Sequence, residues 1–80
     1  MYYLYLLQCQ DDSIYTGITN DVALRFRKHL EKRGGSYTRS HGAKKIIYTE
    51  EYKTKSEALK RELEIKSWRR QRKILLASKV

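Results

Sequence analysis

The sequence contains no proline, a single cysteine and no apolar run long enough to cross a membrane. One cysteine excludes an intramolecular disulfide and a cysteine-based zinc site, and the apolar surroundings of Cys9 predict a buried thiol. No basic start precedes a long apolar region, as a signal peptide requires, so a reducing cytoplasm is the expected location. Neither a repeat nor a low-complexity stretch divides the chain, and residues 1–80 are therefore expected to form one domain.

Basic residues are abundant: 18 Lys and Arg stand against 9 Asp and Glu, which gives a net charge of +9. On a small domain this excess favours a polyanionic partner, with nucleic acid as the first candidate. An acidic membrane surface or an acidic protein, which charge alone supports, ranks last. The charge does not show whether the protein catalyses a reaction, because many small non-enzymatic proteins are equally basic. We expect a monomer that does not associate with membranes.

Two short runs rich in apolar and aromatic residues open the chain, at residues 2–9 and 14–19, and a polar, turn-forming stretch separates them. This pattern predicts a β-hairpin. Because side chains alternate along a strand, Tyr5 and Tyr15 share a face only if the loop holds an odd number of residues, such as 11–13. A slip of one residue would place the two rings on opposite faces of the sheet.

A helix is predicted next, from Val22 to about Lys32, because Asn20-Asp21 offers a capping side chain before it. Its apolar residues recur at helical spacing: Val22, Phe26 and Leu30. On a helical wheel, Arg25 and His29 project beside this stripe. We therefore expect both at the edge of the buried face.

The second half of the chain predicts a strand and a helix. Residues 31–43 lack periodicity and are expected to form a flexible basic loop. Residues 44–52 are β-branched and aromatic and predict a third strand. The capping-box spacing at 54–57 begins a helix that runs to about Arg69, and residues 74–76 allow a short C-terminal helix. The expected fold is α+β, with a small three-stranded antiparallel sheet flanked by helices in the order β-β-α-β-α.

Glu62 occupies an unusual position in the second predicted helix. The apolar residues of that helix average to one direction: Ala58, Leu59, Leu63 and Ile65. Glu62 projects within roughly 20° of the middle of this apolar face. Because a buried unpaired charge is costly, we expect a cation beside it: a metal, Arg25 or Lys66. From the wheel alone, a structural salt bridge is the simplest explanation.

Several of these residues together resemble the GIY-YIG nuclease superfamily. Tyr3-Leu4-Tyr5 stands in place of the first signature and Tyr15-Thr16-Gly17 in place of the second, with Arg25 ten residues further on and Glu62 on a helix. The likeness covers nearly all 80 residues. Within the superfamily, the sequence is similar to the pattern of the small, stand-alone bacterial members. Two departures are visible. Tyr3 replaces the glycine of the first signature, and Ile74 stands where many members carry a substrate-positioning asparagine.

The resemblance implies a metal-dependent endonuclease that hydrolyses phosphodiester bonds in DNA. It implies one divalent ion, Mg²⁺ or Mn²⁺, at Glu62, and phosphate binding by Arg25. Tyr5, Tyr15 and His29 are all candidates for the proton acceptor of the attacking water. A tyrosine with a pKa of about 10 is a poor base at neutral pH, whereas histidine is better matched. Three alternatives therefore stay open.

Other residues are candidates for DNA binding. Gly17, inside a strand, indicates a position that another group approaches closely, and Thr16 is a candidate phosphate contact. Tyr37, between cations, is suited either to stack on a base or to pack back on the domain. The full candidate set is Thr16, Gly17, Lys32, Arg33, Tyr37, Arg39, Lys66, Arg69 and Arg70.

The expected substrate is structured or single-stranded DNA in repair or recombination, and a protein partner is a candidate for targeting the enzyme. The alternative is a non-catalytic nucleic-acid-binding module on the same scaffold.

Overall fold

The predicted hairpin, third strand and helices are all present in the computed structural model, which describes residues 1–31 and 36–78. The elements follow in the order β1 (Tyr2–Cys9), β2 (Ile14–Thr19), α1 (Val22–Leu30), α2 (Ser36–His41), β3 (Ala43–Tyr52), α3 (Lys55–Lys66) and α4 (Arg70–Ser78). The sheet is antiparallel with strand order β2-β1-β3, which confirms the α+β class. No helix in the described residues is long and apolar enough to span a bilayer.

The hairpin register brings the two signature tyrosines to one face. Tyr5 lies opposite Gly17, and Leu7 lies opposite Tyr15. Directly opposed residues share a face, so both rings project to the same side. The loop has an odd number of residues, as this arrangement requires, but it is formed by residues 10–12 rather than 11–13. Asp12 has a φ of 67°, and its N–H donates to the Cys9 carbonyl at 3.0 Å, as in a three-residue hairpin loop.

Helix α1 begins at Val22 as predicted, but its cap is Asp21 rather than Asn20, because the Asp21 side chain accepts a hydrogen bond from the Leu24 N–H at 3.0 Å. Its buried face differs from the predicted one. Leu30 is 51% exposed, whereas His29 is 1% exposed. The expectation that Leu30 would be buried and His29 would lie at the edge is wrong, because side chains hydrogen-bonded to the His29 ring let this polar residue enter the core.

The segment expected to be a flexible loop contains helix α2. Thr38 is fully buried in α2, and His41 Nδ1 hydrogen-bonds to the Asp11 carboxylate in the hairpin loop. Polar contacts hold this helix in place, and a search for apolar periodicity does not detect them. The sequence expectations for Lys32 and Arg33 lie outside the described residues.

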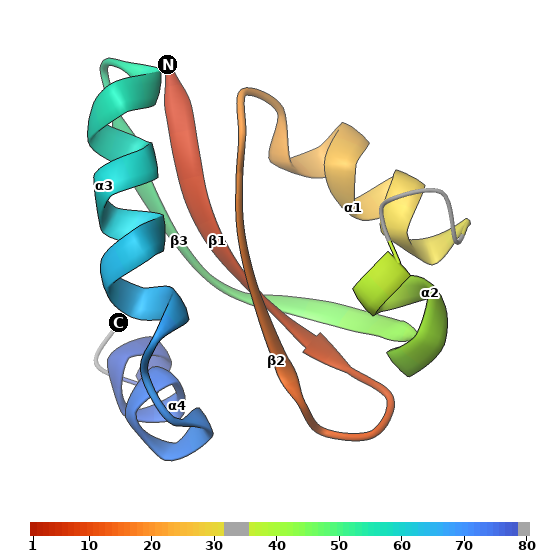
Figure 1. Cartoon of the computed structure of the whole chain (residues 1–80). Coiled ribbons are helices and arrows are strands. Elements are labelled where there is room, and N and C mark those ends of the chain that lie inside the picture. The colour runs from red at the N-terminus through yellow and green to blue at the C-terminus, as the bar shows by residue number, and fades with distance from the viewer. Residues whose placement is uncertain (32–35, 79–80) are drawn as a thin grey trace.

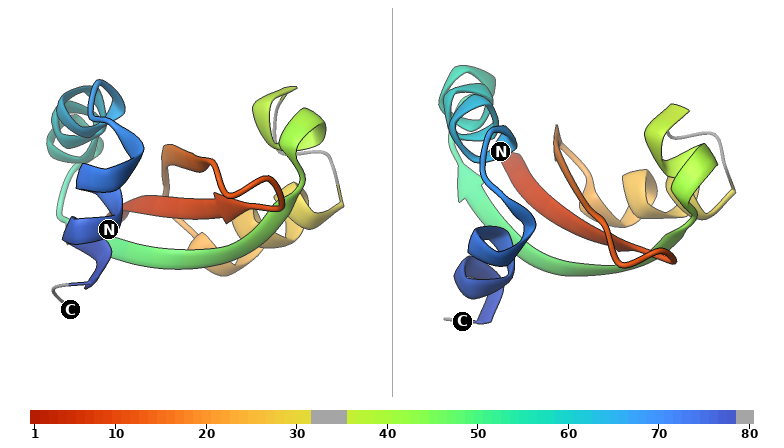
Figure 2. Two further views of the ribbon diagram at one scale, coloured as in Figure 1. Left: turned by 90° about the horizontal axis from the view of Figure 1, so that it is seen from below. Right: turned by 60° about the horizontal axis from the view of Figure 1, so that its bottom comes forward.

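The helices lie in two groups. Figure 1 shows α3 and α4 on one side of the sheet and α1 and α2 on the other, and both views in Figure 2 agree. Leu4 and Leu6 of β1 pack with Ile65 of α3, whereas Tyr5 and Leu7 pack on the other side with residues that include Phe26 of α1. Because side chains alternate between the two faces of a strand, the central strand β1 packs against α3 with one face and against α1 with the other.

A polar cluster joins α3 to β3. Arg61 donates two hydrogen bonds to the Glu50 carboxylate, at 3.0 and 3.1 Å, and the hydroxyls of Tyr48 and Tyr52 also donate to it. Burial opposes ionisation of Glu50, but these four hydrogen bonds hold its pKa below the usual value. Because Arg61 precedes Glu62 in the helix, this cluster fixes the rotation of α3 about its axis.

Replacement of Glu50 by Gln is expected to lower the free energy of unfolding by about 2 kcal/mol, because it removes the charge that Arg61 faces and turns an amide N–H₂ toward donors. Urea unfolding measures this loss. The matched control is Glu64→Gln, since Glu64 pairs with the same Arg61 but its side chain is 57% exposed, and the change there is expected to stay below about 1 kcal/mol. Equal losses in the two variants would contradict the prediction.

Candidate active site

The rings of Tyr5 and Tyr15 close over Gly17. Their centroids are 6.2 Å apart, and a Cβ added at Gly17 would lie 2.6 Å from Tyr5 Oη and 2.9 Å from Tyr15 Cε2. These distances are shorter than any carbon atom tolerates, so only glycine fits beneath the two rings. The predicted close approach to Gly17 is therefore present, and the approaching groups are the two signature tyrosines.

His29 is buried between Tyr5 and Thr38. Its Nε2 lies 2.8 Å from Tyr5 Oη, and its Nδ1 lies 2.7 Å from Thr38 Oγ1. Burial and, to a smaller extent, the charge of Arg25 lower the pKa of His29 to about 4. The ring is therefore neutral at pH 7. Both ring nitrogens are engaged by protein groups, so His29 does not meet an attacking water directly.

Arg25 brings a positive charge to both phenols. Its guanidinium hydrogen-bonds to Tyr5 and Tyr15. Burial by itself lowers the pKa of Arg25, but the contacts with the two phenols outweigh burial and raise it. Burial raises the pKa of Tyr5 to about 12, while Arg25 partly offsets this increase. Arg25 also lines an open pocket of about 380 Å³ beside Lys28 and Lys55. The site thus holds a fixed cation next to space that a phosphate can enter.

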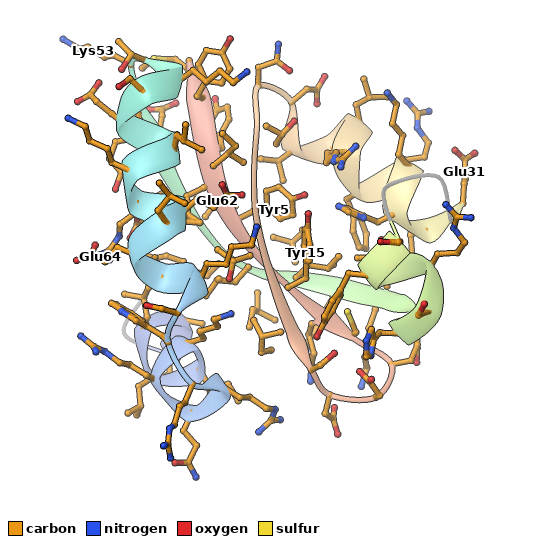
Figure 3. The ribbon with its side chains drawn as sticks, viewed as in Figure 1. Tyr5, Tyr15, Glu31, Lys53, Glu62 and Glu64 are labelled. Atoms are coloured by element: carbon orange, nitrogen blue, oxygen red, sulfur yellow. The ribbon has the colours of Figure 1, made fainter. Side chains whose placement is uncertain are left out.

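Glu62 is half-buried and lies on the side of α3 that faces the strands. Figure 3 shows its side chain directed from α3 toward Tyr5 and Tyr15. Its charge is close enough to contribute to the raised pKa of Tyr5. Leu63 is 64% exposed and Ile65 is buried, so Glu62 lies at the edge of the buried face of α3 and not at its centre, where the helical wheel predicts it.

The carboxylate of Glu62 forms no hydrogen bond or ion pair with any described residue. The expected protein cation, Arg25 or Lys66, is thus not bonded to it within the part of the chain that the structure describes. The same residues contain no group of three or more His, Cys, Asp and Glu side chains arranged to hold a metal. A metal at this site would have a single carboxylate ligand from the described residues.

The candidate DNA-binding residues divide into two groups. Arg39, Lys66 and Arg69 are exposed, as phosphate contacts require. Arg70 is also exposed, but its Nε donates to the Asp12 carbonyl and so ties α4 to the hairpin loop. Thr16 is buried on the face opposite the tyrosines, because alternate residues of β2 point to opposite sides, and it is not a surface phosphate contact.

Tyr37 extends the aromatic surface of the site. Its ring centroid lies 5.5 Å from that of Tyr15 and 4.1 Å from that of His41, and its side chain remains partly exposed. It therefore packs on the domain and also remains accessible to solvent. Neither this stacking nor the role of Thr38 follows from the sequence pattern, because both depend on a helix that hydrophobic periodicity does not reveal.

Two signature tyrosines with tilted rings, a histidine and an arginine from the next helix, and a glutamate from a later helix are the residues expected of a GIY-YIG-type site. Residues 1–74 match the family model of the GIY-YIG catalytic domain. The chain therefore belongs to the GIY-YIG family, whose domain acts as a nuclease on DNA and generally uses a divalent metal.

The relatives place the chain among the UPF0213 proteins of this family. It is 57% identical over 65 residues to the UPF0213 protein H16_B0156 of Cupriavidus necator, covering 81% of this chain and 71% of that protein. It is 45% identical over 75 residues to the UPF0213 protein of Staphylococcus aureus strain Mu3, covering 94% and 92%. The solution NMR structure of the UPF0213 protein BH0048 from Bacillus halodurans has a TM-score of 0.60 and 40% identity, covering 98% of this chain and 84% of that one.

Replacement of Gly17 by Ala is expected to displace the Tyr5 phenol and break its hydrogen bond to His29, with a loss of about 1–3 kcal/mol in the free energy of unfolding. The NMR signals of the His29 ring report the displacement directly. Glu50→Gln is the control, since it removes hydrogen bonds in the cluster that joins α3 to β3 and leaves the His29 partners in place. Glu50→Gln should lose stability with unchanged His29 signals; unchanged signals in Gly17→Ala would refute the steric argument.

His29 makes the stability depend on pH. Its pKa is about 4 in the folded chain against 6.5 for an ordinary histidine, so the unfolded chain binds more protons between these values. The free energy of unfolding is therefore expected to fall, by up to about 3 kcal/mol, as the pH drops from 6.5 to 4. An NMR titration of the His29 ring measures the pKa, and His29→Gln should flatten the stability profile in this range. A His29 ring that titrates near pH 6.5 would contradict this expectation.

Proposed function

We propose that this protein is a divalent-metal-dependent endonuclease that hydrolyses phosphodiester bonds in DNA. The observation that carries the proposal is the half-buried carboxylate of Glu62, which has no partner among the described residues and is directed toward Tyr5 and Tyr15. A carboxylate in this position is available to a cation from outside the described part of the chain. The net charge of +9 supports a polyanionic substrate.

The donor chemistry of Glu62 fits Mg²⁺ or Mn²⁺. Mg²⁺ keeps several waters and is commonly bound through one or two carboxylates together with substrate phosphates, so a site with one carboxylate is sufficient. When bound, such an ion polarises the phosphate and stabilises the leaving oxygen. Arg25 then binds the non-bridging oxygens, because its planar group of N–H donors matches phosphate geometry.

Tyr5 and His29 act together as the proton acceptor. The Tyr5 phenol is protonated at neutral pH, because its pKa is about 12, so it accepts a proton only while it releases its own. His29 Nε2, at 2.8 Å, is the group that receives this proton. As the water oxygen forms its bond to phosphorus and the bond to the leaving oxygen breaks, the water proton would pass to Tyr5 Oη and the phenolic proton to His29, while the leaving oxygen departs as an alkoxide that takes a proton from solvent.

Single-stranded, flapped or branched DNA is the substrate that the surface favours. The partly exposed ring of Tyr37 adjoins Tyr15, and an aromatic ring beside a cleavage site can stack on an unpaired base. Arg39 lies on the same short helix and adds charge for the backbone. A protein partner that targets a monomeric enzyme to repair or recombination intermediates completes the proposal.

A non-catalytic nucleic-acid-binding module is the second candidate function. Two observations favour it: the described residues contain no cluster of metal ligands, and Ile74 replaces the asparagine that positions substrate in many family members. The basic surface serves a binder and a nuclease equally well, so only a cleavage measurement separates the two functions.

The decisive experiment measures cleavage of fluorescent single-stranded, flapped, branched and duplex DNA with and without Mg²⁺ or Mn²⁺. Metal-dependent cleavage is expected, and Glu62→Gln or Arg25→Lys should lower the rate at saturating substrate by at least about 100-fold. Glu64→Gln, an exposed carboxylate on the same helix, is the matched control and should retain activity. Binding without metal-dependent cleavage would favour the binding module, and equal cleavage by all variants would indicate a contaminating nuclease.

A further inference from the structure

We infer that Thr38 sets the protonation of the His29 ring and thereby directs the Tyr5 proton toward His29, which makes Thr38 a positioning residue of this site. Thr38 is fully buried in α2, and its Oγ1 lies 2.7 Å from His29 Nδ1. The catalytic consequence of the inference rests on the proposed function. The assignment of protons does not, because it follows from the hydrogen-bond partners alone.

The assignment begins at Tyr5. The guanidinium of Arg25 has donors and no acceptor, so in its hydrogen bond to Tyr5 the phenolic oxygen accepts. The phenolic proton therefore needs a different partner, because Tyr5 is buried and a buried donor without an acceptor is costly. His29 Nε2, 2.8 Å away, is an acceptor only when it carries no proton. Tyr5 thus requires an unprotonated Nε2.

The proton of the neutral ring must then lie on Nδ1. A neutral imidazole carries one N–H, and His29 is neutral at pH 7 because burial lowers its pKa. The Nδ1–H donates to Thr38 Oγ1, which is the hydroxyl beside it. One hydroxyl from α2 therefore accepts the Nδ1 proton and stabilises the tautomer that leaves Nε2 free for Tyr5.

Replacement of Thr38 by valine removes this hydroxyl and changes the hydrogen bonding of the His29 ring. With valine at position 38, the Nδ1–H would be buried without an acceptor, so the tautomer with its proton on Nδ1 would lose its advantage and a larger share of the rings would carry the proton on Nε2. In that share Nε2–H donates to Tyr5 Oη, the phenolic O–H is left without an acceptor, and Tyr5 loses the group that takes its proton. Valine has nearly the same shape as threonine, so packing in α2 is preserved.

The test combines ¹⁵N NMR of the His29 ring with kinetics of the full chain. At pH 7 the parent protein should show a protonated Nδ1 and an unprotonated Nε2. Thr38→Val should shift the proton toward Nε2 and lower kcat on the cleaved DNA about 10- to 100-fold with little change in KM. Thr38→Ser keeps the hydroxyl and should restore both the ring pattern and most of the rate.

Thr16→Val is the matched control for the ring pattern. Thr16 is also buried, but its hydroxyl has no hydrogen-bond partner among the described residues, so the same substitution there should leave the His29 ¹⁵N signals unchanged. A protonated Nε2 in the parent protein, or the parent pattern in Thr38→Val, would overturn the inference. Correct tautomers without any DNA cleavage would instead overturn the proposed function, so the two failures are distinguishable. If Thr38→Val does not fold, the parent spectrum and Thr38→Ser still decide the assignment.

Discussion

The hydrogen bond between Tyr5 and the buried His29 is the interaction on which the site depends. Tyr5 belongs to the central strand, and its ring lies so close over Gly17 that it has no room to move toward β2. His29 restrains the hydroxyl of Tyr5, because the His29 ring is buried and is itself hydrogen-bonded to Thr38. The Tyr5 phenol is therefore restrained by Gly17 at its ring and by His29 at its hydroxyl, and it keeps one orientation.

The second part of the site is held by different interactions on the other side of the sheet. Glu62 belongs to α3, whose rotation depends on the hydrogen bonds between Arg61 and Glu50. Arg61 also faces the ring of Trp68, at 5.4 Å from its centroid. The carboxylate and the phenols thus belong to two layers of the domain that are held by separate sets of hydrogen bonds.

Local rules predicted much of this arrangement. The hairpin, the parity of its loop, the start of α1 and the cap at Thr54 follow from short-range chemistry, and each is present. The prediction for α1 failed at Leu30 and His29, because hydrophobic periodicity ranks leucine as core and histidine as surface. Burial of His29 depends on partners 24 and 9 residues away, and a wheel contains no such information. The same reason hides α2, whose buried group is a hydroxyl.

A domain of 80 residues has little apolar interior, so polar networks inside it do structural and functional work at once. An apolar residue in place of His29 would fill the same space and remove a costly buried polar group. The histidine makes sense only if the chain gains something that packing does not provide, namely a defined position and proton acceptor for Tyr5. The two Glu50–Arg61 hydrogen bonds follow the same logic at α3, where a specific rotation matters more than the depth of burial. Among the described residues, the polar groups around His29 and around Glu50 each hold a neighbouring side chain in one orientation: the first holds Tyr5, and the second holds Arg61 in the helix that carries Glu62.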